Sequence, residues 1–124
     1  MGKFANDTIM DAALGVIASA NLLIICTSQP TTRANAISSG VTSTPLTPGL
    51  GGASFTLANG DTSGRKVTIA QQANMNVAST GTVTHIALID GTNLLYVTTC
   101  TSQLLTVGNT VATSPWSVTI SDPV

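Results

Sequence analysis

The chain has 124 residues, enough for one domain with a substantial buried core. Only 7% of the residues are charged, against about 25% in a typical soluble domain, and the formal net charge is −1. Four basic residues and 3% aromatic residues provide neither the phosphate-binding patch nor the stacking surfaces that direct nucleic-acid binding requires.

Uncharged polar side chains must therefore form most of the surface. Threonine and serine lose less conformational entropy than lysine or glutamate when an interface orders them. A net charge near zero also gives little repulsion between copies. This composition favours a protein that packs against neighbouring chains; the alternative is a small soluble β-domain with a neutral surface.

The N-terminal segment is predicted to be an arm over residues 1–8 followed by a helix over residues 9–20. Asn6, Asp7 or Thr8 can cap this helix, and acidic residues in its first turn suit the helix dipole. Apolar residues recur at helical spacing and are expected to form the stripe by which the helix docks. They are Ile9, Ala12, Ala13, Val16, Ile17 and Ala20.

The same segment has some features of a targeting sequence, because Lys3 precedes an apolar run that ends in Ala-Ser-Ala. Asp7 and Asp11 interrupt that run, which is also shorter than the roughly 20 apolar residues that cross a membrane. We expect a soluble protein without a membrane partner.

A continuous apolar segment from Leu22 to Thr27 predicts a strand that is buried on both faces. Residues 29–52 are predicted to form a long loop, because three prolines and a glycine cluster interrupt any periodicity. Loops of this length are usually functional in compact domains, so we expect a contact element here.

Residues 53–121 are predicted to form a β-rich body of short strands separated by turn residues. The expected strands cover residues 53–58, 65–71, 75–78, 82–90, 94–101, 104–107, 110–113 and 116–121. The predicted fold is mainly β: an antiparallel β-sandwich of seven or eight short strands with one N-terminal α-helix, in a single domain over residues 1–124.

No group of residues in the sequence has the pattern of a catalytic or metal site, and we expect neither an enzyme nor a cofactor. His85, the only histidine, is expected to be a hydrogen-bonded and half-buried strand residue. Asp90 lies five residues further on and would face the opposite side of a regular strand, so it cannot orient the imidazole. One histidine without a Cys-x-x-Cys motif leaves zinc short of ligands.

Cys26 and Cys100 both fall within predicted strands and are expected to be reduced thiols. The sequence leaves open whether the two are adjacent. Trp116 and Tyr96 are predicted to be core or interface residues, in preference to a sugar-stacking platform.

Six segments of the chain form a recognisable set of structural motifs: Phe4 to Leu14 (FANDTIMDAAL), Cys26 to Thr32 (CTSQPTT), Gly64 to Thr68 (GRKVT), Gly81 to Asp90 (GTVTHIALID), Leu94-Leu95 and Val107 to Thr110 (VGNT). Together they resemble the small structural proteins of tailed bacteriophages. The resemblance covers most of the chain except residues 33–52, and its segments are structural motifs without an active site.

The resemblance implies a virion component, made in the host cytoplasm and located on the phage head as a decoration (cement) protein. Its expected partners are the major capsid protein and further copies of itself, for example in a trimer that matches a lattice axis. The helix, the 29–52 loop and exposed sheet edges are the expected contact elements. The predicted contact residues are Phe4, Gln29, Pro30, Arg33, Val41, Pro45, Leu46, Pro48 and Leu50.

Two other functions remain open at this point. One is a structural protein of the phage tail or baseplate. The other is a carbohydrate-binding β-sandwich, which an exposed and coplanar Trp116 and Tyr96 would favour.

Overall fold

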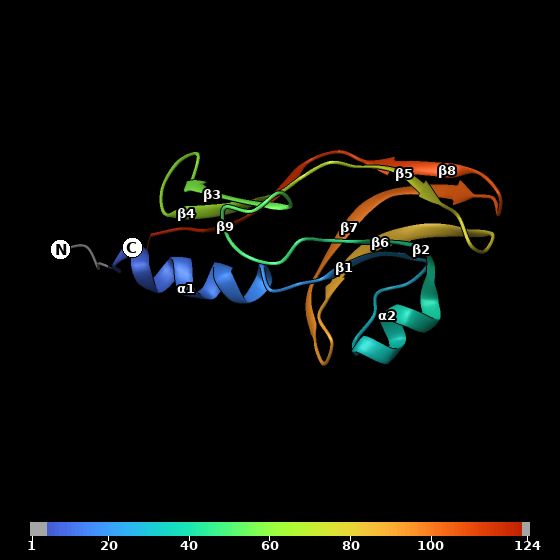
Figure 1. Ribbon diagram of the computed structural model, residues 1–124, viewed down its shortest axis with the longest axis horizontal. Coiled ribbons are helices and arrows are strands. Elements are labelled where there is room, and N and C mark those ends of the chain that lie inside the picture. Colours follow the sequence, from blue (N-terminus) through green and yellow to red (C-terminus); the bar gives the residue numbers. More distant parts are fainter. Residues whose placement is uncertain (1–4, 123–124) are drawn as a thin grey trace. The chain divides into compact units, whose positions relative to one another are not determined.

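A computed structural model describes residues 5–122, which form two helices and nine strands with antiparallel pairing throughout (Figure 1). These residues divide into two compact units. The first unit comprises residues 5–19, Thr47–Gln71 and residues 114–122, and the second comprises Ala20–Leu46 and Gln72–Thr113. The predicted fold class, mainly antiparallel β with an N-terminal helix, is confirmed.

The first unit contains helix α1 (Asp7–Ile17) and a three-stranded sheet. Its strands are β3 (Phe55–Asn59), β4 (Arg65–Ile69) and β9 (Trp116–Ile120), in the order β3-β4-β9. The Asn6 side chain caps α1 by accepting a hydrogen bond from the Thr8 amide at 2.8 Å. The strand register places Phe55, Val67, Ile69 and Val118 on one face of the sheet, where they are buried with Met10 and Leu14 of α1.

The predicted docking stripe of the helix is wrong. Ile9 and Val16 are 66% and 60% exposed, and Ala12 and Ala13 are exposed between them. Met10, Leu14 and Ala18 form the buried face instead. Met10, Leu14 and Ala18 have the i, i+4, i+8 spacing of one helical face, and burial of this face favours its orientation toward the sheet. Asp11, the residue after Met10, forms an ion pair with Arg65 of β4.

The second unit contains a four-stranded sheet, a two-stranded sheet and a short helix. Its elements in chain order are β1 (Leu22–Cys26), α2 (Arg33–Ser39), β2 (Gly40–Pro45), β5 (Gln72–Asn76), β6 (Gly81–Ile89), β7 (Leu94–Leu105) and β8 (Thr110–Thr113). The larger sheet has the order β2-β1-β6-β7, and β5 pairs with β8.

Both faces of β1 are buried, as its unbroken apolar sequence predicts. On one face, Ile24 and Cys26 form a core with Ala36 of α2 and with Ala87 and Ile89 of β6. On the other face, Leu23 and Ile25 lie opposite Leu88 and Ile86 in the register with β6, and all four are buried.

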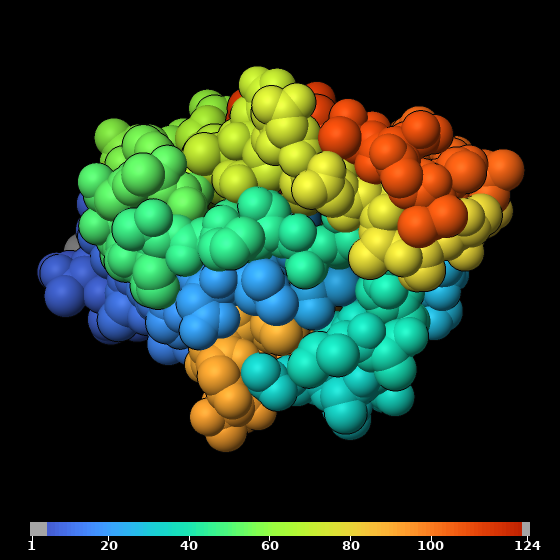
Figure 2. Space-filling view, turned by 45° about the vertical axis from the view of Figure 1, so that its right-hand side comes forward, coloured from blue at the N-terminus to red at the C-terminus, as the bar shows by residue number. Residues whose placement is uncertain are grey.

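The β5–β8 pair is hydrogen-bonded to the end of the larger sheet. The hydroxyl of Thr42 in β2 donates to the carbonyl of Asn76 at 2.7 Å, and the amide of Ala78 donates to the carbonyl of Val41 at 2.8 Å. Figure 2 shows strands β5, in yellow, and β8, in orange-red, side by side on the surface. Met75 and Val77 are buried at this end of the unit.

The predicted loop over residues 29–52 is wrong in its middle part, while residues 29–32 and 46–52 contain no helix or strand, as predicted. Residues 33–39 are helix α2 and residues 40–45 are strand β2, which pairs with β1. The Thr32 side chain caps α2 by accepting from the amide of Asn35 at 3.1 Å, and Gly40 ends the helix. Pairing with β1 then gives residues 40–45 an extended conformation that their own periodicity does not indicate.

Two further differences concern the strands. The pieces predicted at residues 94–101 and 104–107 are one long strand, β7, with a bulge at residues 100–102. Strand β2 lies in the segment predicted as a loop, and the described residues form nine strands where the prediction has seven or eight. The prediction of a single domain over residues 1–124 stays a prediction.

Candidate interaction surface

Charge is distributed very unevenly between the two units. The second unit contains one arginine, Arg33, and one aspartate, Asp90, as its only formally charged side chains. The 31 residues from Gly91 to Ser121 contain no Asp, Glu, Lys or Arg at all. The second unit therefore presents a surface made almost entirely of uncharged side chains.

The two charged residues of the second unit meet at the turn between β6 and β7. Arg33 Nε donates to the backbone carbonyl of Asp90 at 2.8 Å, which ties α2 to this turn. The Asp90 carboxylate accepts from the amides of Asn93 at 2.6 Å and Thr92 at 2.7 Å. The hydrogen bonds from Asn93 and Thr92, with a smaller contribution from the charge of Arg33, lower the pKa of Asp90.

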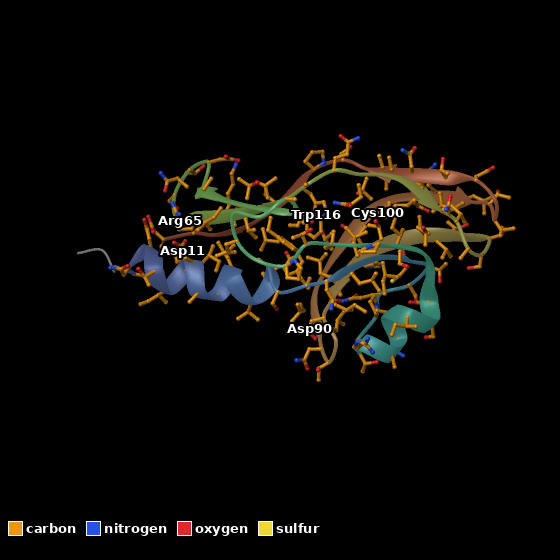
Figure 3. All side chains as sticks on the ribbon, viewed as in Figure 1. Asp11, Arg65, Asp90, Cys100 and Trp116 are labelled. Atoms are coloured by element: carbon orange, nitrogen blue, oxygen red, sulfur yellow. The ribbon has the colours of Figure 1, made fainter. Side chains whose placement is uncertain are left out.

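The first unit contains two ion pairs. Asp11 Oδ1 lies 2.8 Å from Arg65 Nε, and Figure 3 shows the two side chains pointing toward each other. The hydrogen bond to Asp11 raises the pKa of Arg65. Lys66 Nζ pairs with Asp61 at 2.6 Å. The Asp11–Arg65 pair is partly buried, whereas the Asp61 side chain is exposed, and an exposed pair adds little to stability.

The clearest candidate for an interaction surface is the outer edge of β7. This strand of 12 residues ends the four-stranded sheet and has a strand neighbour only on its β6 side. Its second half is exposed from Thr101 to Leu104, with Leu104 at 63% and Val107 just beyond the strand at 55%. An exposed strand edge with apolar side chains is a site for pairing with another chain.

A shallow groove of about 200 Å³ lies beside the opposite edge of this sheet. It is lined by β1, α2, β2 and the segment after β5, with Ile24, Ile37 and Val41 among its apolar residues. None of its lining residues is charged or is a histidine or cysteine. The groove thus offers apolar contacts and main-chain polar groups but no acid, base or nucleophilic thiol.

The histidine and the two cysteines are the side chains with potential reactivity, and each is at least partly buried. His85 is half-buried, as predicted, with its Nδ1 2.7 Å from the hydroxyl of Thr84. Cys26 is fully buried, with its sulfur 3.6 Å from the carbonyl of Ala36, and burial raises the pKa of its thiol. Burial also raises the pKa of Cys100. Among residues 5–122, no three His, Cys, Asp or Glu side chains are grouped to hold a metal ion.

The strand register answers the question of the two cysteines. Cys26 of β1 lies opposite His85 of β6, which lies opposite Thr99 of β7, the residue before Cys100. Two strand spacings, about 10 Å, therefore separate the cysteines, and a disulfide requires Cα atoms within about 7 Å. Both are free thiols, and Figure 3 shows Cys100 within the second unit.

The predicted contact residues do not form one continuous element. Gln29, Pro45 and Pro48 are exposed, whereas Arg33 and Leu50 are half-buried. The other described members are buried, which leaves their side chains inaccessible to a partner: Pro30, Val41 and Leu46. Gln29 to Leu46 belong to the second unit and Pro48 and Leu50 to the first, while Phe4 lies outside the described residues. That the exposed members contact a partner stays a prediction.

The aromatic side chains give little support to a sugar-stacking platform. Trp116 belongs to the first unit and its indole nitrogen is buried, while Tyr96 belongs to the second unit and is half-buried. A stacking platform needs exposed ring faces.

The sequence analysis missed the β7 edge because it divided this strand into two. The uncharged stretch after Asp90 is compatible with an unprotected edge strand, but it spans β7, β8 and β9 and does not indicate which of them ends the sheet. No helix within residues 5–122 is long and apolar enough to cross a membrane.

Comparison with known proteins finds no matching family model, no similar curated protein and no similar solved structure.

Proposed function

We propose that the chain is a non-enzymatic structural protein of a tailed-bacteriophage virion, and specifically a decoration protein that binds the major capsid protein on the outer shell of the head. Two observations support this proposal. The first is the resemblance of its sequence segments to small phage structural proteins. The second is the nearly charge-free surface of the second unit, with its long exposed strand edge.

The charge-free surface is the observation that carries most weight. Uncharged side chains lose less hydration free energy than charged ones when another chain covers them, whereas a buried lysine or glutamate must find a partner. Short threonine and serine side chains also lose little entropy in an ordered interface. A surface of this kind suits a protein that functions while covered by neighbouring chains.

A decoration protein acts by mass action on the shell. If it binds the assembled capsid lattice but not the separate subunits, its binding free energy adds to the stability of the lattice. The second unit supplies contacts for this role through its exposed residues Gln29 and Pro45.

A structural role in the tail or baseplate rests on the same features and is the second candidate. The two roles differ in stoichiometry, because shell proteins approach the copy number of capsid subunits and tail components do not.

The direct test is cosedimentation of the purified protein with phage capsids that lack it. A charged variant, Gln29→Lys/Pro45→Lys, places two lysines on the second unit. A matched control, Thr56→Lys/Thr62→Lys, places the same charge at exposed positions of the first unit. We expect saturable binding of the wild type and the control, and at least about tenfold weaker binding of the charged variant.

Absence of wild-type binding to such capsids would overturn the capsid proposal. Equal binding of both variants would remove Gln29 and Pro45 from the contact surface. Circular dichroism of each variant checks that the β fold is intact.

A further inference from the structure

We infer that the β7 edge is a self-association surface, through which two copies of the chain pair their β7 strands antiparallel and join their four-stranded sheets into one. The inference does not rest on the capsid proposal, because it concerns the purified protein alone.

The first argument is the hydrogen-bonding capacity of the strand. In a sheet strand, alternate residues direct their amide and carbonyl groups to opposite sides. In β7, residues 96–99 pair without interruption with residues 85–88 of β6. In the strand order of residues 5–122, β7 ends the sheet, so no strand is hydrogen-bonded to its outer side.

The second argument is that the strand lacks the usual protection. Edge strands normally carry lysine or proline, which prevent pairing with other chains, and Leu94–Leu105 contains no charged residue and no proline. The bulge at residues 100–102 interrupts the pairing of β7 with β6. Thr99 on one side of the bulge is exposed, and so are Thr101 to Leu104.

In contrast to β7, the strand at the opposite edge of the sheet, β2, is protected. The carbonyl of Val41 in β2 already accepts from the amides of Ala78 and Ser79, and the Thr42 hydroxyl donates to Asn76. Pro45 ends this strand. Of the two edges, β7 is therefore the one open to a new strand.

The third argument identifies the occupant as a second copy. A two-fold antiparallel pair places each β7 residue opposite another β7 residue, so the strand must be compatible with itself. Every register places only uncharged side chains in opposition, many of them threonine, valine and leucine, which favour cross-strand pairing. The charged residue nearest to β7 along the chain is Asp90, whose backbone carbonyl accepts a hydrogen bond from Arg33.

Such pairing is isologous and gives a two-fold dimer, which differs from the trimer expected from the resemblance. The ladder is short, so the contact belongs to the small and weak class of interfaces. We expect a dissociation constant at or below about 100 μM.

Sedimentation velocity of the full chain between about 1 and 100 μM tests the inference. The β7 variant is Thr99→Lys/Thr101→Lys, which places two lysines on the β7 strand of each copy and therefore four in the dimer. The matched control is Thr56→Lys/Thr62→Lys in the first unit. We expect a monomer–dimer equilibrium for the wild type and the control, and a dissociation constant raised at least tenfold for the β7 variant.

A wild type that stays monomeric throughout this range overturns the inference, and so does a trimer or a dimer that the β7 variant leaves unchanged. If the control weakens association as well, hydrogen–deuterium exchange of the wild type decides. Slower exchange of residues 94–105 at high concentration supports the β7 edge, and protection confined to other segments contradicts it.

Discussion

At the residue scale, the Asp90 carboxylate stabilises the turn between β6 and β7. The carboxylate accepts hydrogen bonds from two backbone amides, and the backbone carbonyl of Asp90 accepts one from the Arg33 guanidinium. These contacts favour the ionised carboxylate and lower its pKa below the unfolded value. The stabilisation is therefore present above the unfolded pKa of about 4 and is lost as the pH falls through the folded pKa.

Asp90→Asn should keep an acceptor oxygen in the turn but remove this pH-linked contribution. We expect the variant to be less stable than the wild type at pH 7 and to lose less stability between pH 5 and about pH 3. Asp90→Ala should be less stable still at pH 7, because the two amides lose their acceptor. Thermal unfolding across this pH range measures both effects, and parallel profiles for the wild type and Asp90→Asn would contradict the assignment.

The cysteines offer a second test at the same scale. Cys26 is buried among Ile24, Ala36 and Ala87, and its raised pKa leaves little reactive thiolate. We expect a thiol reagent to modify Cys100 first and Cys26 only when the chain unfolds. In a time course of thiol modification, a Cys100→Ser variant should lose the faster of the two phases.

Without added reductant, the unfolded wild type should titrate two thiols per chain, since the register keeps the cysteines apart. Fewer than two, in protein kept from air oxidation, would indicate a disulfide and contradict the register.

At the element scale, the turn between β3 and β4 depends on a glycine. Gly64 has φ +74°, and a Cβ atom there would collide with the carbonyl of Ile120 in β9. Gly108 also has a positive φ, +91°, but has open space around it. A comparison of substitutions at these two glycines therefore distinguishes the cost of backbone strain from the cost of a steric clash.

Gly108→Ala should lower the free energy of unfolding by about 1 kcal/mol through backbone strain alone. Gly64→Ala should lower it by at least about 2 kcal/mol more, because the turn and β9 must also move apart. Urea unfolding of the two variants measures the difference. Equal losses would show that β9 does not pack against Gly64 as described.

The elements also show what local sequence can and cannot predict. Most strands were predicted within a few residues, because alternating apolar residues and turn residues act locally. Helix α2 was missed, since seven residues are too few to show a helical period and its ends depend on Thr32 and Gly40. The predicted buried face of α1 was wrong because the helix carries apolar residues at helical spacing on more than one side. Packing with the rest of the first unit, which the helix sequence alone does not determine, buries Met10 and Leu14 and leaves Ile9 and Val16 exposed.

The interaction surface was less predictable than the fold. Whether a strand ends a sheet depends on the order of all its strands, and no single strand records that order, so the β7 edge could not be read from residues 94–105 alone. Burial by tertiary packing likewise removed Val41 and Leu46 from the predicted contact residues. Gln29, Pro45 and Pro48 were placed on the surface as expected.

At the scale of the whole molecule, charge is concentrated in the first unit and nearly absent from the second. Composition indicates the scarcity of charge, but only the fold shows that one of two compact units carries almost none of it. This segregation is the physical basis for the proposal that the second unit is covered by other chains in the assembled particle.

The most direct measurement is the molar ratio of this protein to the major capsid protein in purified particles of the phage that encodes it. Quantitative mass spectrometry of gradient-purified particles provides that ratio. We predict a ratio of the same order as one, as expected for a protein that covers the shell. A few copies per particle would place the protein in the tail or at a single vertex, and its absence from the particles would contradict the proposed virion function.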